Sequence, residues 1–198
     1  MNVYGAPISL AYAGSNGTLQ FSATPNLKPF YFGQCVPVDP SQGGPFIDTL
    51  FPYYDDLRTD DLTPCPDCGI FTQTLGTAPN RQFVIRWKTT YFMHTGTAEF
   101  EVLLTEGSNT LSAIYGSSDN NGLEAGSGIQ HSLTLFTSFS CLEAVLTPGL
   151  RVNYIPTSCG SPTPTPTATA TATPTPTPAS SARPTPPPRP RPTPRPRP

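Results

Sequence analysis

The last 38 residues, 161–198, limit what this chain can fold into more than any other feature of the sequence. They contain 15 of the 27 prolines and no Leu, Ile, Val, Phe, Tyr, Trp or Met. A segment without large apolar side chains cannot bury a core, and proline favours an extended polyproline II conformation. We therefore predict a folded domain over residues 1–160 and a disordered, low-complexity tail over residues 161–198.

The tail has a Thr/Pro-rich half followed by a Pro/Arg-rich half. Threonine-rich segments with proline are typical of O-glycosylated stalks. The candidate glycosylation sites are Thr163, Thr165, Thr167, Thr169, Thr171, Thr173, Thr175 and Thr177.

The same two parts of the chain have net charges of opposite sign. Residues 1–160 carry all 13 acidic residues and six Lys or Arg, a net charge of −7, whereas the tail carries five Arg and no acid. Nucleic-acid binding needs clustered positive charge, so we expect no nucleic-acid partner for the domain. No apolar run approaches the roughly 20 residues of a membrane-spanning helix. The sequence starts without a signal peptide, and we expect that a leader precedes Met1 in the natural protein.

Apolar and polar residues alternate in short runs along the domain, and Gly, Pro, Asn and Asp separate the runs. This period of two predicts β-strands, and no window shows the spacing of an amphipathic helix. Asn16-Gly17 predicts a hairpin turn. Further strands are expected at 50–54, 69–75, 82–91, 98–106, 110–115, 128–136 and 150–155. We predict an all-β fold, an antiparallel β-sandwich of about nine short strands.

The clearest hairpin covers residues 82–106. A turn centred on residues 94–96 would place Trp87 opposite Val102, with the apolar residues of both strands on one buried face. The other face would then carry Arg86 and Lys88 opposite Glu99 and Glu101. A solvated charge ladder explains the two glutamates better than a glycosidase acid pair does.

Cys65 and Cys68 form a CxxC pair in a chain with five cysteines. A redox CxxC would precede a helix, and a zinc site would need two further ligands. We interpret the pair as a local disulfide, with zinc, redox chemistry and free thiols as alternatives.

Four aspartates form the best candidate metal site, because hard oxygen ligands on a loop suit Ca²⁺. They are Asp55, Asp56, Asp60 and Asp61. Their spacing does not match an EF-hand, and the alternative is that they cap turns and keep the loop soluble. We expect no other cofactor. No Gly-x-Ser-x-Gly, His-Glu-x-x-His or phosphate-loop pattern occurs, so we expect no enzymatic activity.

Aromatic side chains near loops are candidates for ligand binding, since aromatic rings contact sugars and anchor interfaces. We interpret most of them as core residues. The candidate ligand-facing aromatics are Tyr53, Tyr54, Tyr91 and Phe92.

Several segments, in this order, carry a resemblance to a known family. They are residues 15–21 (Ser-Asn-Gly-Thr-Leu-Gln-Phe), 51–57 (Phe-Pro-Tyr-Tyr-Asp-Asp-Leu), 69–72 (Gly-Ile-Phe-Thr), 78–87 (Ala-Pro-Asn-Arg-Gln-Phe-Val-Ile-Arg-Trp), 100–107 (Phe-Glu-Val-Leu-Leu-Thr-Glu-Gly) and 114–116 (Ile-Tyr-Gly). They resemble a β-rich module common in secreted bacterial proteins, and distantly the NIDO domain of nidogen, tectorin and mucin-like extracellular proteins. The family usually has Trp where this chain has Tyr54, and its usual opening strand is cut short by Met1.

The resemblance implies an extracellular or cell-surface location and a pairing of Cys35 with Cys141, which leaves Cys159 over. It also implies a non-enzymatic role in adhesion or matrix association, displayed here on the Pro-rich stalk. The partners would be an extracellular glycan, a matrix or cell-wall component, or other copies of the chain. The alternatives are a structural subunit of a surface fibre and an accessory domain of a secreted hydrolase.

Overall fold

The computed structural model describes residues 1–25, 34–39, 46–61, 63–93 and 95–156. The chain divides into two units, Met1–Ser158 and Cys159–Pro198. The second unit lies outside the described residues, and with it Cys159 and the candidate glycosylation sites Thr163–Thr177. Within the described ranges all regular structure is β, and no helix there could cross a membrane.

The strands follow one another in short segments. They are β1 (Asn2–Val3), β2 (Ala6–Pro7), β3 (Tyr12–Gly14), β4 (Thr18–Gln20), β5 (Thr49–Tyr54), β6 (Leu57–Arg58), β7 (Gly69–Leu75), β8 (Gln82–Tyr91), β9 (Thr97–Thr105), β10 (Leu111–Ser118), β11 (Gly126–Gln130), β12 (Phe136–Cys141) and β13 (Arg151–Tyr154). The structure has more strands than the predicted nine because several strands are only two or three residues long. Strands this short give no periodic signal in the sequence.

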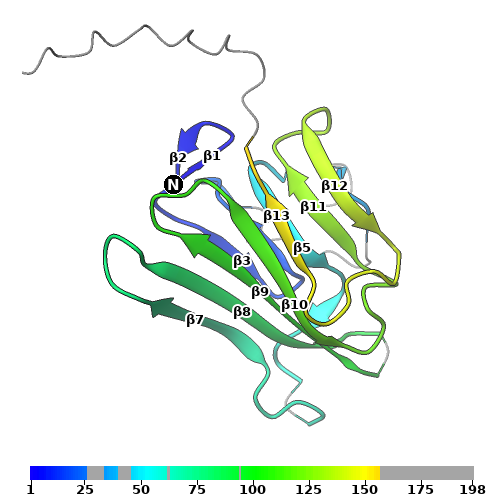
Figure 1. Ribbon diagram of the computed structural model, residues 1–198. Helices are drawn as coiled ribbons and strands as arrows, with labels where there is room; N and C mark the ends of the chain where they lie inside the picture. Colours follow the sequence, from blue (N-terminus) through cyan, green and yellow to red (C-terminus); the bar gives the residue numbers. More distant parts are fainter. Residues whose placement is uncertain (26–33, 40–45, 62, 94, 157–198) are drawn as a thin grey trace, which may run out of the picture. The chain divides into compact units, whose positions relative to one another are not determined.

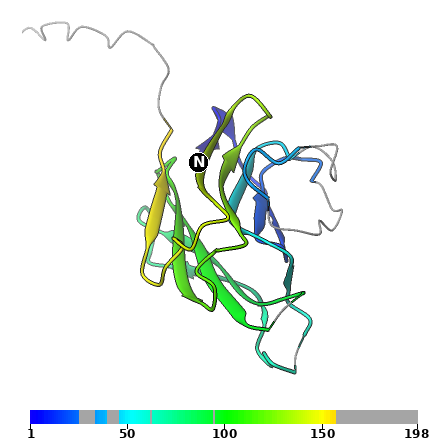
Figure 2. The same cartoon turned by 90° about the vertical axis from the view of Figure 1, so that its right-hand side faces the viewer.

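Two antiparallel sheets face each other, as predicted for a sandwich (Figures 1 and 2). One has the order β13-β10-β9-β8-β6, with β7 also paired to β8, and the other has the order β12-β11-β5-β4-β3. A separate two-stranded ladder, β1-β2, lies at the N-terminus.

The hairpin of β8 and β9 has a different register from the predicted one. Trp87 pairs with Phe100, and Ile85 pairs with Val102. The pairing is centred one residue earlier than expected, and Gly96, with a φ of 125°, lies just before β9. This moves the pairing by two residues. A shift of two leaves every side chain on its predicted face, so the buried apolar face is preserved.

The segment predicted as one strand over 128–136 is two strands, β11 and β12, joined by a turn at 131–135. The hydroxyl of Ser132 accepts hydrogen bonds from the backbone N–H of Thr134 and of Leu135, at 3.3 and 3.1 Å. Serine side chains that bond nearby backbone compete with a continuing strand. The alternation of Leu133 and Leu135 therefore belongs to a turn, and both side chains are exposed.

The main core lies between the two sheets and is centred on aromatic rings. Phe100 stacks on Trp87 at 5.2 Å and on Tyr53 at 5.3 Å between ring centroids. The indole N–H of Trp87 donates to the carbonyl of Gly14 on the opposite sheet, at 2.8 Å. This bond satisfies a buried polar group while its ring fills the core.

A second apolar cluster covers the other face of β5. It consists of Val36, Val38, Phe46, Phe51 and Tyr54. The segment that supplies Val36 and Val38 crosses β11 closely, since a Cβ on Gly126 would collide with the carbonyl oxygen of Gln34. The Cys35–Cys141 disulfide fastens this segment to β12.

Candidate functional site

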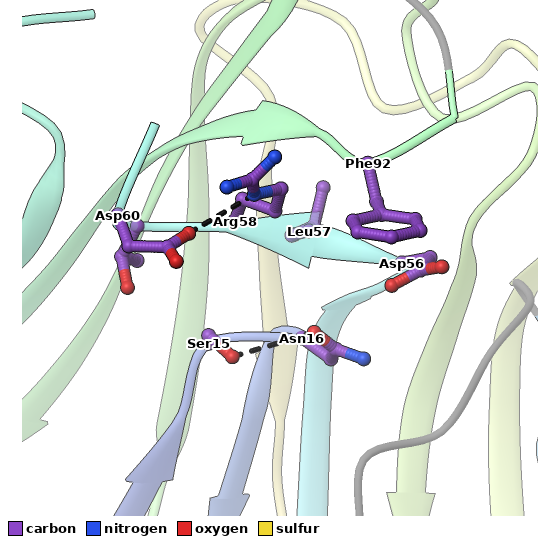
Figure 3. Close-up of a pocket in the computed structure, with 8 residues that line it drawn as sticks. Ser15, Asn16, Asp56, Leu57, Arg58, Asp60 and Phe92 are labelled. Carbon is purple, nitrogen blue, oxygen red and sulfur yellow. Dashed lines mark hydrogen bonds and ion pairs between the residues drawn. The ribbon is translucent and has the colours of Figure 1, made fainter. Parts of the chain in front are cut away.

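A pocket of about 380 Å³ opens at one end of the sandwich (Figure 3). It is lined by Ser15, Asn16, Asp56, Leu57, Arg58, Thr59, Asp60 and Phe92. These residues come from the turn between β3 and β4, from β6 with its flanking loops, and from the residue after β8.

The position of the β3–β4 turn follows from a glycine. Gly17 has a φ of 71°, and its N–H bonds the carbonyl of Gly14. A Cβ at Gly17 would collide with the carbonyl oxygen of Tyr53, so no other residue fits at this close approach. The turn therefore lies against the end of β5 and holds Ser15 and Asn16 at the wall of the pocket.

The opposite wall is held by backbone pairing. Leu57 pairs with Tyr91, and the N–H of Phe92 donates to the carbonyl of Asp56 at 2.9 Å. This places the half-exposed ring of Phe92 beside the Asp56 carboxylate, as Figure 3 shows.

Arg58 contacts two carboxylates and the aromatic ring at the pocket. Its guanidinium donates to Asp60 at 3.0 Å, lies 3.9 Å from Asp61, and stands 5.6 Å from the ring centroid of Phe92. The hydrogen bond from Arg58 holds the pKa of the Asp60 carboxyl below its usual value. Both carboxylates therefore already have a cationic partner in Arg58.

Asp56 differs from these two aspartates. Among the residues that the structure describes, no hydrogen-bond donor reaches its carboxylate, and burial raises its pKa. A partly buried acceptor without a donor gains most from a ligand that brings one. Asp56 and the ring of Phe92 lie side by side on one wall of the cavity, and Asn16 belongs to the other wall (Figure 3).

The four aspartates named as a calcium site do not come together as ligands. Asp55 is buried and accepts the N–H of Asp56 at 2.8 Å, while Asp60 and Asp61 face Arg58. Over the described ranges no group of three or more His, Cys, Asp or Glu could hold a metal ion. The geometry therefore gives the calcium prediction no support.

Of the four candidate ligand-facing aromatics, three lie in the core and one is exposed. Tyr53, Tyr54 and Tyr91 are each at most 3% exposed, whereas Phe92 is 52% exposed. The hydroxyls of Tyr53 and Tyr91 lie 2.7 Å apart and both donate to the side-chain oxygen of Asn120. Burial raises the pKa of Tyr53 and of Tyr91, which keeps both rings neutral inside the core.

Cys65 and Cys68 are joined by a disulfide in the loop before β7. Asp67, between them, forms an ion pair with Lys88 of β8. The bond therefore shapes a loop that lies against the outer face of the β8–β9 hairpin.

Glu99 and Glu101 lie on that outer face as a charge ladder. Arg86 donates to Glu99 at 2.7 Å and lies 4.0 Å from Glu101, and Lys88 lies 3.8 Å from Glu99. These ion pairs support the interpretation of the two glutamates as a solvated ladder rather than a catalytic pair.

Sequence reasoning missed Asn16 and Arg58 as pocket residues. Asn16 was assigned only to a turn, and the turn's contact with β5 is not visible in a local pattern. Arg58 carries a signal that could have been used, since one basic residue lies within three positions of Asp55, Asp56, Asp60 and Asp61.

The family described as NIDO related matches residues 1–180 of this chain. No curated protein and no solved structure matches this chain.

Proposed function

The chain belongs to the NIDO-related family, and we propose that it is a non-enzymatic adhesion module that binds an extracellular glycan at the pocket around Phe92. Family and disulfides together suggest an extracellular domain, because structural disulfides persist in oxidising compartments. A matrix or cell-wall component that carries such a glycan is the corresponding partner.

The single observation that carries this proposal is that an exposed ring lies beside a carboxylate, that of Asp56, to which no donor among the described residues forms a hydrogen bond. Sugar hydroxyls can donate to the Asp56 carboxylate, and the apolar face of a sugar ring can pack on Phe92. The Arg58 guanidinium lies over the ring of Phe92, 5.6 Å from its centroid, and this contact restrains the ring before a ligand binds.

The test is a glycan and matrix-protein binding array with the full chain, its Phe92→Ala variant and its Asp56→Asn variant. We expect binding to one glycan class and its loss by about tenfold or more in each variant. Phe71→Ala is the matched control, because Phe71 is 50% exposed on β7, away from the pocket residues. A blank array, or equal binding by all variants, would reject the pocket as the ligand site.

A second candidate function is that of a structural subunit in a surface assembly. The observation that favours it is the uncharged, exposed edge strand β12, whose side chains include Phe136 and Phe139. Such an edge can pair with another chain. An accessory role beside a secreted hydrolase remains the third proposal, and no described contact favours it over these two.

A further inference from the structure

Strand β12 is the last strand of its sheet. Its inner edge pairs with β11 from Phe136 to Cys141, with a register shift that leaves Phe139 between two paired residues. Within the described ranges no strand pairs with its other edge (Figure 1). Five of its six residues are exposed. The free edge therefore offers backbone N–H and C=O groups that a further strand can pair with.

Large apolar side chains are exposed on β12 and in the segments that flank it in the sequence. The exposed ones are Leu133 (42%), Leu135 (51%), Phe136 (39%), Phe139 (44%), Leu142 (44%) and Val145 (42%). Contiguous exposed apolar surface of this kind marks an interaction site in soluble proteins. Such a row on a strand edge points to a protein partner that also supplies a strand.

The charge on the neighbouring strand differs between this edge and the other long open edge, β7. No charged residue occurs between Ser132 and Leu142. By contrast, β7 pairs with the part of β8 that carries Arg86 and Lys88, and Asp67 lies two residues before its start. Charged side chains at sheet edges oppose pairing with another chain. β7 itself is uncharged like β12, but the strand beside it is charged, whereas neither β12 nor its neighbour β11 carries a charged side chain.

We propose that β12 pairs antiparallel with β12 of a second copy of this chain, so that two five-stranded sheets become one continuous sheet. A twofold axis perpendicular to the sheet makes the edge its own partner and keeps the corresponding faces of both copies on the same side. The proposal deepens the second candidate function and is independent of the pocket around Phe92.

The exposed apolar area agrees with a dimer of moderate stability. Side chains of this size, at these exposures, offer about 500 Å² of apolar surface on each copy, or about 1,000 Å² in a symmetric pair. The paired backbones add to this, which brings the total toward the roughly 1,200–2,000 Å² of specific interfaces.

The strand is also held in place before any partner binds. The ladder to β11 fixes one edge, the disulfide to Cys35 fixes Cys141, and Ser140 is buried at 3% exposure. A rigid strand loses little conformational entropy on pairing, which favours association.

The test measures the molar mass of the full chain across a concentration series by sedimentation equilibrium. All proteins carry Cys159→Ser, so that a tail disulfide cannot link two chains. We expect a reversible dimer, and we expect Phe139→Lys and Thr137→Lys each to raise its dissociation constant by about tenfold or more. Phe71→Lys and Thr72→Lys, at exposed positions on the other long open edge, β7, are the matched controls and should leave the dissociation constant within about twofold.

A monomer at every concentration up to about 0.5 mM would overturn the proposal, since that limit corresponds to a dissociation constant in the millimolar range. An equal effect of the β7 and β12 variants would also overturn it. Thermal melts of each variant verify that it folds, and glycan binding of Phe139→Lys separates the two functions. Dimer loss with retained glycan binding supports self-pairing by β12 and leaves the pocket proposal intact.

Discussion

Gln130 is a polar side chain that the fold buries almost completely, at 1% exposure. Its amide donates to the carbonyls of Val38 and Phe46 at 3.2 Å and accepts from the N–H of Val38 at 2.7 Å. One side chain therefore satisfies three backbone groups of two residues, Val38 and Phe46, that lie outside the described strands. Such groups carry a large penalty when they are buried without a partner.

Gln130→Leu should destabilise the domain by about 2–4 kcal/mol, because three buried backbone groups lose their hydrogen-bond partner while the volume of the side chain stays similar. Chemical denaturation followed by fluorescence measures the change. Gln73→Leu is the matched control, since Gln73 is exposed on β7. Equal stability of the two variants would contradict the structural role assigned to Gln130.

The pH dependence of stability should include a contribution from Glu106. The hydrogen bond from the Arg81 side chain lowers the pKa of Glu106 to about 2, from an ordinary value of 4.5. A lowered pKa in the folded state stabilises the protein above the unfolded value and loses that effect as the pH falls toward 2. In the Glu106→Gln variant the melting temperature should therefore fall less than in the parent chain as the pH is lowered from about 4.5 to about 2. An unchanged acid profile would contradict this assignment.

Neighbouring residues illustrate what sequence can predict at this scale. Tyr91 is the last residue of β8 and enters the core, while Phe92 is the first residue beyond it and is exposed. A local pattern predicts aromatic residues near a strand end, but the exact residue at which the strand ends decides which ring faces the solvent. That residue is set here by the pairing with β6, which is too short to recognise from its sequence.

At the scale of elements, long alternating runs were the predictable part. Strands β5, β7, β8 and β9 lie close to their expected ranges, and the Asn16-Gly17 hairpin is present. The division between β11 and β12 was not predicted, because Leu133 and Leu135 continue the alternation through a turn. The pocket was not predictable either, since its walls come from elements far apart in the sequence and depend on how β3–β4 packs against β5.

The two disulfides join cysteines at very different separations in the sequence. Cys35 and Cys141 are 106 residues apart, and Cys65 and Cys68 are three apart. In the chain-entropy description, closing the longer loop stabilises by about 5 kcal/mol and closing the shorter one by about 2 kcal/mol. The double variant Cys35→Ala/Cys141→Ala should therefore lose clearly more stability than Cys65→Ala/Cys68→Ala, as denaturant midpoints can measure. The reverse order would contradict the role of the long disulfide as a fastener of the second apolar cluster.

At the scale of the whole molecule, the sequence joins an acidic domain to a basic tail. We expect the five tail arginines to retain the full chain on an anionic polymer at low salt, and about 0.5 M salt to release it, because screening weakens exposed ion contacts. Replacing those five arginines by glutamine should abolish retention, while Arg81→Gln in the domain should leave it unchanged. Retention that persists without the tail arginines would place the anion contact elsewhere.

Trp87 gives this protein an optical property that follows from its position. It is the only tryptophan of the chain, it is fully buried, and its ring stacks on Phe100 at the centre of the sandwich. Its emission therefore reports on one defined place rather than on an average over many rings. A blue-shifted spectrum that moves to longer wavelength on denaturation would signal the separation of the two sheets, without any added label.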